Sequence, residues 1–176
     1  FQASSIIVVC FFSKSFSDIL NPSLVSSIIS IRSLHTFVFD EYINKKEVLN
    51  EEGYLVNPPK EFVEVLNFAN SISENTNGAF DVTVQPLWIA HVDFFKNKYH
   101  QNLDDLNKKI QEAKKLVSYK NISIDKKEIK FKLEGMKITL NGIAQGYITD
   151  KITQILKQKG FTNVLVDLGE FSSIGG

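Results

Sequence analysis

Three short stretches of the sequence carry the residues whose types and spacing could do chemistry. The first, residues 78–88, reads GAFDVTVQPLW. Its Gly-Ala pair leaves the backbone uncovered for the close approach of a flat ligand, Phe80 could lie against an aromatic ring, and Asp81 could accept hydrogen bonds from a ligand. A structural interpretation stays open and is favoured by the residues alone: a helix stop, an Asx-turn at Asp81 and a buried strand over 82–84.

The second stretch, residues 139–150, reads TLNGIAQGYITD and is typical of a strand, a glycine-containing turn and a helix start. Free N–H groups at a helix N-terminus, with the positive end of the helix dipole, suit an anion such as phosphate. The small residues Gly142, Ala144 and Gly146 keep side chains out of the way. The spacing matches neither a Walker loop nor a G-x-G-x-x-G fingerprint, and many α/β proteins contain such a junction, so it does not by itself identify a ligand.

The third stretch places Asp167 and Glu170 on either side of a strand end. Two neighbouring carboxylates could bind a divalent metal or act as acid and base, although we favour solvated turn carboxylates. The three histidines have no i, i+4 metal-binding spacing, so we expect surface or core positions for His35, His91 and His100. We expect core or subunit-contact positions for the aromatic residues Trp88, Phe94, Phe95 and Tyr99.

The composition excludes several other kinds of site. Twenty Lys and Arg residues balance 20 Asp and Glu residues, whereas a nucleic-acid-binding surface normally leaves a basic surplus, so we predict no nucleic-acid partner. Cys10 is the only cysteine, which excludes an intramolecular disulfide framework and a multi-cysteine zinc site. Hydrophobic residues make up 43% of the chain, which is enough for a packed core.

Hydrophobic periodicity predicts three helices that must position these stretches. The first has Asn57 as its N-cap and Pro58 in its first turn, and it is closed by Asn77-Gly78. The second spans residues 103–117 and has a polar outer face. The third follows Asn141-Gly142 and ends at Gly160.

Alternation of apolar residues with period two predicts the strands. It runs over residues 122–124, 129–133 and 136–140, which indicates an antiparallel meander. A buried strand over 164–166 follows the last helix, and Leu168-Gly169-Glu170 turns out of it. Together these elements predict an α+β fold, a mostly antiparallel sheet with packed helices, as an incomplete part of a larger domain.

Residues 1–36 differ from the rest of the chain, because only Lys14, Asp18 and Arg32 carry formal charges there. The apolar run of residues 4–12 is about half the length needed to cross a bilayer, and we interpret it as a strand or an irregular start. We therefore expect an atypical N-terminal segment over 1–36 and a separate domain over 37–176. Because the sequence stops directly after an apolar strand, which should be covered and paired, we expect a fragment.

Taken together, the stretches 78–88, 139–150 and 162–170, in that order, resemble the ApbE-type FAD:protein FMN transferases, with looser support from Leu49-Asn50. The resemblance implies an enzyme that binds FAD and Mg²⁺, transfers FMN to a threonine hydroxyl of a target protein in a membrane electron-transfer complex, and releases AMP. It also implies work in the periplasm or at the outer face of the cytoplasmic membrane, although no export signal is seen in this sequence. Some family members instead hydrolyse FAD.

The resemblance also implies roles for individual residues. Five positions match family contacts to FAD: Ala79, Phe80, Asp81, Thr139 and Gln145. Gly142 matches a metal-ligand position, where it could offer only its backbone carbonyl, and Phe39 is a candidate aromatic contact to FAD. Many relatives carry a charged residue where Gln145 stands, so its neutral amide implies a different phosphate affinity.

The missing C-terminal half of the family domain would carry the carboxylate metal ligands, so we expect this chain by itself to be at best a weak FAD binder. Two alternatives stay open. The chain could be a truncated, non-catalytic module that binds flavin or a partner protein. It could also be a generic α/β nucleotide binder with its phosphate site at residues 139–150.

Overall fold

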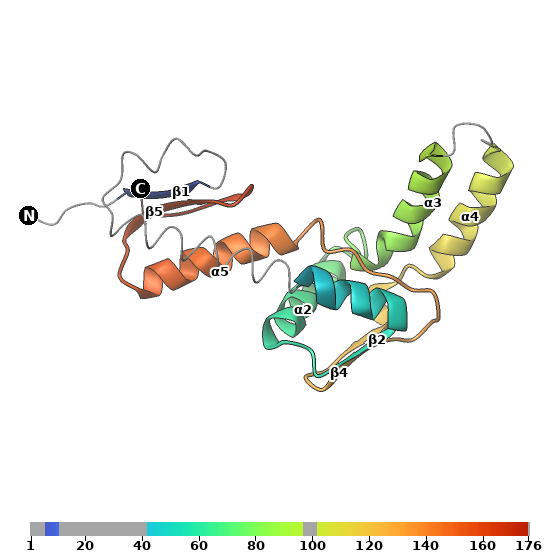
Figure 1. The fold of residues 1–176 in the computed structure, drawn as a ribbon, viewed down its shortest axis with the longest axis horizontal. Coiled ribbons are helices and arrows are strands. Elements are labelled where there is room, and N and C mark those ends of the chain that lie inside the picture. The colour runs from blue at the N-terminus through green and yellow to red at the C-terminus, as the bar shows by residue number, and fades with distance from the viewer. Residues whose placement is uncertain (1–5, 11–41, 97–101, 176) are drawn as a thin grey trace, which may run out of the picture. The chain divides into compact units, whose positions relative to one another are not determined.

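The computed structural model describes residues 6–10, 42–96 and 102–175 (Figure 1). These residues belong to two compact units, and we describe each by itself. One unit is Tyr42–Gly142, and the other contains Ile143–Gly176 together with the N-terminal strand. No helix in the described ranges is both long enough and apolar enough to cross a membrane.

The unit Tyr42–Gly142 is built on a small antiparallel sheet. Residues 42–52 are helical and lead into β2 (Tyr54–Val56). The sheet has the order β2-β4-β3, with β3 at Ile122–Ile124 and β4 at Glu128–Phe131. Ile129 of β4 pairs with Leu55 on one side and with Ile124 on the other. The side chains that fill this core and are almost fully buried are Leu49, Phe62, Leu66, Ile129, Met136 and Ile138.

Helix α2 (Lys60–Asn75) supplies much of this core. The residues whose helical spacing predicts this helix are Phe62, Val65, Leu66, Ala69 and Ile72. The first four are buried and Ile72 is half-buried, so the predicted apolar stripe is confirmed for four of its five residues. The helix ends at Asn75, and the N–H of Gly78 donates to the carbonyl of Ser73 at 2.8 Å, so the predicted helix stop is confirmed.

The predicted start of α2 is wrong by two residues. Pro59, not Asn57, occupies the N-cap position. Asn57 instead has a left-handed φ of 49°, which asparagine tolerates better than most residues. Its N–H donates to the carbonyl of Lys127 at 2.7 Å. Asn57 therefore closes the end of the β2–β4 pair and is not available as a helix cap.

The third predicted strand is also wrong. The burial of residues 136–140 alternates as the pattern indicated, but these residues belong to no strand and form no ladder with β4. The second edge of β4 is taken by β2. The backbone of Ile138 is bonded to a side chain, that of Asn50, and the N–H of Thr139 donates to the carbonyl of Val82. Alternation reports one-sided burial, and it does not say which group supplies the hydrogen bonds.

Two more helices belong to this unit, and the first of them begins within the stretch 78–88. They are α3 (Gln85–Lys96), which we did not predict, and α4 (Leu103–Lys115), which confirms the predicted helix 103–117 within two residues. Asn102 caps α4 by accepting a hydrogen bond of 2.9 Å from the N–H of Asp104. Trp88 and Phe95 are 62% and 64% exposed, so they are not core residues in the described part of the chain.

The second unit contains one helix and a three-stranded sheet. Helix α5 (Ala144–Gln158) contacts both β5 (Asn163–Asp167) and β6 (Phe171–Ile174), which pair with each other in antiparallel fashion. Strand β1 (Ile6–Cys10) pairs with β5 in parallel and gives the order β1-β5-β6. The predicted helix and buried strand are confirmed here, and the chain as a whole has the predicted α+β fold.

Candidate functional site

The residues that we singled out at 79–81 lie on a bend between α2 and the 3₁₀ helix η2 (Val82–Val84). The N–H of Phe80 donates to the hydroxyl of Thr76 at 3.2 Å, which ties the bend to the end of α2. Ala79 is exposed and Phe80 is half-buried. A partly exposed aromatic ring is suited to stack against a flat group.

Asp81 is the most heavily bonded residue of this bend. One of its carboxylate oxygens accepts from the N–H of Thr83 at 2.8 Å and from the hydroxyl of the same residue at 2.6 Å. The other oxygen accepts from the N–H of Tyr119 at 2.8 Å. The predicted Asx-turn is therefore confirmed, whereas the predicted strand over 82–84 is wrong, because Asp81 caps η2 there.

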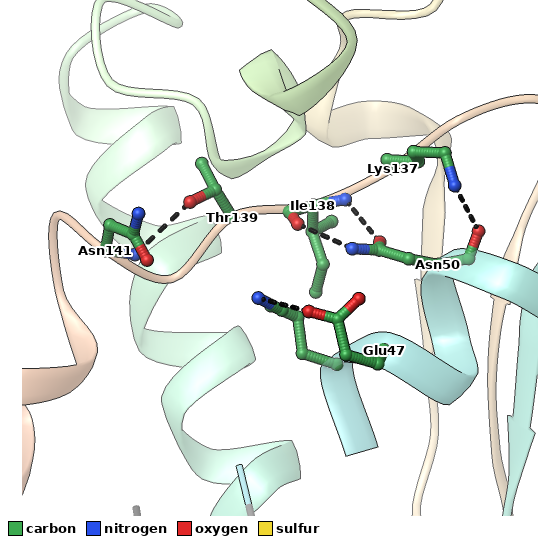
Figure 2. A network of polar contacts seen from close by, with 7 residues as sticks. Glu47, Asn50, Lys137, Ile138, Thr139 and Asn141 are labelled. Atoms are coloured by element: carbon green, nitrogen blue, oxygen red, sulfur yellow. Dashed lines mark hydrogen bonds and ion pairs between the residues drawn. The ribbon is translucent and has the colours of Figure 1, made fainter. Parts of the chain in front are cut away.

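The beginning of the second stretch, residues 139–142, lies beside the bend that carries Phe80. The N–H of Thr139 donates to the carbonyl of Val82 at 2.8 Å. The N–H of Asn141 approaches the hydroxyl of Thr139 at 3.4 Å (Figure 2). A Cβ atom built on Gly142 would lie 3.7 Å from Cε2 of Phe80. Residues from the two stretches, about 60 positions apart in the chain, are thus neighbours: Phe80 beside Gly142, and Val82 bonded to Thr139.

Gln145 belongs to the other unit, in the first turn of α5. Its side-chain Nε2 donates to the carbonyl of Leu168 at 2.5 Å, and so it joins α5 to the turn between β5 and β6. Ile143 occupies the N-cap position of α5 and makes no side-chain capping bond. The first turn of α5 therefore keeps backbone N–H groups that no side chain of its N-cap satisfies.

The third stretch shows the features of an ordinary turn. Asp167 accepts a hydrogen bond of 3.0 Å from the N–H of Gly169, and Glu170 is exposed. His91 is exposed, with its Nδ1 2.7 Å from the carbonyl of Leu87. His35, His100, Phe39 and Tyr99 lie outside the described residues.

A metal site cannot be completed from the part of the chain that the structure describes. It contains no group of three or more His, Cys, Asp and Glu side chains placed to hold an ion. Gly142, the predicted metal ligand, brings only a backbone carbonyl. Mg²⁺ normally needs one or two carboxylates within an octahedron of oxygen atoms, so the donors present do not fit this ion on their own.

Two residues that shape this region were not among the predicted site residues. The backbone N–H of Tyr119 donates to the second carboxylate oxygen of Asp81. The side-chain amide of Asn50 is bonded to the backbone of Ile138, next to Thr139. No local pattern could have revealed Tyr119, because the contact depends on how the chain returns after α4. The sequence did point to Asn50, because the pair Leu49-Asn50 resembles the family. That resemblance did not indicate what Asn50 does.

Comparison with known proteins links this arrangement to a family. The model of the ApbE family matches residues 31–176. A curated protein from Buchnera aphidicola subsp. Schizaphis graminum (strain Sg), named FAD:protein FMN transferase, is 30% identical over 114 residues, which cover 62% of this chain and 33% of that protein. This chain therefore spans about a third of the length of that curated relative.

Two solved structures have a similar fold. The apo form of the flavinyl transferase ApbE from Pseudomonas stutzeri is 26% identical, with a TM-score of 0.54 over 68% of this chain and 35% of that one. The ApbE protein of Thermotoga maritima is 23% identical, with a TM-score of 0.58 over 83% of this chain and 49% of that one. The second likeness concerns the fold alone.

Proposed function

Because the chain belongs to the ApbE family, we propose that it forms part of an FAD:protein FMN transferase. In the proposed reaction, the hydroxyl oxygen of a threonine on a target protein forms a bond to the FMN phosphorus of FAD. The bond from that phosphorus to the bridging oxygen breaks, AMP leaves with that oxygen, and the proton of the threonine hydroxyl passes to solvent. The target would be a protein of a membrane electron-transfer complex, and the site of work would be the periplasm or the outer face of the cytoplasmic membrane.

The observation that carries the FAD-binding part of this proposal is the placement of Phe80 beside Gly142. Gly142 is exposed and Phe80 is half-buried, with 3.7 Å between Cε2 of Phe80 and the position that a Cβ of Gly142 would take. Gly142 brings no side chain to its side of the Phe80 ring, so a flat ligand could approach the aromatic surface there. Thr139, three residues before Gly142, brings a hydroxyl that can donate to a ligand.

The second unit, taken by itself, has one feature that favours the binding of an anion. The first turn of α5 contains Ala144 and Gly146, and its N-cap, Ile143, does not cap the helix with a side chain. The positive end of the helix dipole and uncapped N–H groups favour an anion there. Gln145 adds no formal charge, so we expect the contribution of this turn to phosphate affinity to be modest.

The family implies Mg²⁺, and the described residues do not fit it alone. The carboxylate of Asp81 already accepts three hydrogen bonds, and the Gly142 carbonyl would supply only one neutral oxygen ligand to the ion. When bound, Mg²⁺ would neutralise charge on the phosphates. We propose that this chain by itself binds Mg²⁺ weakly.

The incomplete metal donor set favours one other candidate function, a non-catalytic module that binds flavin. Such a module would bind FAD without transferring FMN. Incubation of the whole transferase of which this chain forms part in the proposal, with FAD, Mg²⁺ and a threonine-containing target peptide, separates the two functions, because covalent FMN on the peptide appears only with the transferase. Competition by ATP would indicate a generic nucleotide binder.

Calorimetric titration of FAD into the chain tests the proposed site, with Phe80→Ala as the test variant. We expect FAD affinity to fall roughly tenfold, because a stacked aromatic contact contributes about 1 kcal/mol or more. The matched control is Phe95→Ala, which makes the same change at a side chain that is 64% exposed on α3. Equal affinities for the unmodified chain and for Phe80→Ala would remove Phe80 from the site.

A further inference from the structure

The pair Leu49-Asn50 has no role in the function proposed so far, yet Asn50 makes one of the longest-range side-chain contacts of its unit. Its Nδ2 donates to the carbonyl of Ile138 at 2.9 Å, and its Oδ1 accepts from the N–H of Ile138 at 2.7 Å, across 88 positions of sequence (Figure 2). We infer that Asn50 is a positioning residue, which holds residues 138–142 against the bend that carries Phe80. The effect on FAD rests on the proposed function, but the geometry does not.

The side-chain amide of Asn50 takes the place of a neighbouring strand. An antiparallel partner would exchange one N–H···O bond in each direction with Ile138, and the amide of Asn50 supplies both bonds from a single group. Asn50 is only 9% exposed and Ile138 is fully buried. A side chain that cannot reproduce both bonds would leave buried backbone groups without partners, which costs more than the net value of the bonds themselves.

The next residue is held from the other side. The N–H of Thr139 donates to the carbonyl of Val82, immediately after Asp81. The helix over 42–52 therefore holds Ile138, while η2 holds Thr139. Two adjacent peptide units fixed from two different elements leave little freedom for the segment, so the position of Gly142, three residues later, is largely decided by these two contacts.

Lys137 strengthens the same contact. Its Nζ donates to the backbone carbonyl of Asn50 at 3.0 Å (Figure 2). This carbonyl lies near the C-terminal end of the helix over 42–52, where a positive charge interacts favourably with the helix dipole. The backbone and the side chain of Asn50 are thus both bonded to the segment that leads to Thr139. Loss of the amide should loosen the backbone that leads from Ile138 to Gly142, while the core formed by α2 and the sheet stays in place.

The test uses Asn50→Ala, which removes both bonds, and Asn50→Asp, which keeps an acceptor for the N–H of Ile138 but cannot donate to its carbonyl. The matched controls make the same two changes at Asn107, which is exposed on α4. The first readout is the nuclear Overhauser effect between the Phe80 ring and the α-protons of Gly142. The second is the exchange rate of the Ile138 amide proton, and the third is the affinity for FAD.

We expect Asn50→Ala to weaken the Phe80–Gly142 signal and to speed exchange at Ile138, whereas Asn50→Asp keeps Ile138 partly protected and still weakens the signal. FAD affinity should fall roughly tenfold in both variants, as expected when a buried polar group loses its partner. In a Phe80→Ala background this loss should largely vanish, because Asn50 acts through the position of the segment beside Phe80. A merely structural role would not produce that non-additivity.

Three results would overturn the inference. They are an unchanged Phe80–Gly142 signal in a folded Asn50→Ala chain, an equal change in the Asn107 controls, and additive effects with Phe80→Ala. If neither Asn50 variant folds, the hydrogen-bond coupling between the amide nitrogen of Ile138 and the side chain of Asn50 decides the matter in the unmodified chain, and its absence refutes the contact. If the unmodified chain binds no FAD, the proposed function fails. The nuclear Overhauser and amide-exchange measurements then still test whether Asn50 positions the segment.

Discussion

One carboxylate oxygen of Asp81 accepts a hydrogen bond of 2.8 Å from the backbone N–H of Tyr119, 38 positions further along the chain. The other oxygen holds the fully buried Thr83 through two more bonds. A carboxylate has about four acceptor sites, and three are occupied by the protein. We therefore expect Asp81 to shape the bend that carries Phe80 more than it binds a ligand.

The first prediction concerns Asp81→Ala. Because the change removes three hydrogen bonds to an ionised group, two of them to backbone N–H groups, we expect the free energy of unfolding to fall by about 2–4 kcal/mol. Urea unfolding followed by circular dichroism measures this loss. Exchange of the Tyr119 amide proton should become faster at the same time.

A matched control exists at Asp125, which accepts a hydrogen bond of 2.9 Å from the N–H of Lys127 in an exposed turn. Asp125→Ala should cost less than about 1 kcal/mol, because the bond is exposed and local. Equal losses for the two variants would show that the contact with Tyr119 contributes nothing to stability.

Much of the helical structure could be predicted, because the signal for a helix lies within the helix itself. The apolar stripe of α2 and the capped, strongly amphipathic sequence of α4 each repeat with helical spacing over several turns. Helix α3 was missed because its apolar residues surround the helix, and only Ala90 among them is buried. The sequence of α3 therefore lacks the apolar stripe that predicts a half-buried helix.

The candidate site divides in the same way between local and distant contacts. The Asx-turn from Asp81 to Thr83 spans two residues, and the sequence predicts it correctly. The bond from Asp81 to Tyr119 and the pairing of Asn50 with Ile138 depend on chain segments that meet only after folding. Residue types alone do not show which distant segments of the chain come into contact. For that reason residues 136–140 were wrongly predicted as a third strand of the meander.

The second prediction concerns Gln145→Glu. The carboxylate cannot donate to the carbonyl of Leu168, and two oxygen atoms would then face each other at a distance of 2.5 Å in the present geometry. This costs about 1–3 kcal/mol, whereas a negative charge in the first turn of α5 recovers only about 0.3–1 kcal/mol. We therefore expect a net loss of stability in the second unit, measured as faster amide exchange at Val164 and Val166.

Gln154→Glu makes the same chemical change at an exposed position in the middle of α5 and should leave these exchange rates unchanged. If both variants behave alike, the tether from Gln145 to Leu168 has no energetic role. If Gln145→Glu is more stable than the unmodified chain, the helix dipole outweighs the lost hydrogen bond.

The third prediction compares two glycines of the second unit that have almost the same backbone conformation. Gly169 has a φ of +91° and Gly160 a φ of +90°. A Cβ on Gly169 would collide with the side-chain amide of Gln145, whereas a Cβ on Gly160 would meet nothing within 4 Å. Both alanine variants should lose about 1–2 kcal/mol from the left-handed conformation, and Gly169→Ala should lose more.

Thermal unfolding of the two variants measures the difference, and a third chain with Gly169→Ala and Gln145→Ala together isolates its cause. In this double variant the collision is absent. Its loss of stability should therefore equal the cost of the left-handed conformation at residue 169 plus the cost of the lost hydrogen bond from Gln145 to Leu168. Equal stabilities of Gly160→Ala and Gly169→Ala would mean that the Gln145 side chain moves aside freely.

The last prediction concerns Gly142→Ala. The added methyl would lie 3.7 Å from Cε2 of Phe80, an ordinary van der Waals distance, so we expect the free energy of unfolding to change by less than about 0.5 kcal/mol. The same methyl would occupy the open space beside the ring. FAD affinity should therefore fall although stability does not, and Gly142→Val should lower it further. If titration gives the same FAD affinity for all three chains while Phe80→Ala still binds more weakly, the flavin nucleotide approaches Phe80 from a side that Gly142 does not border.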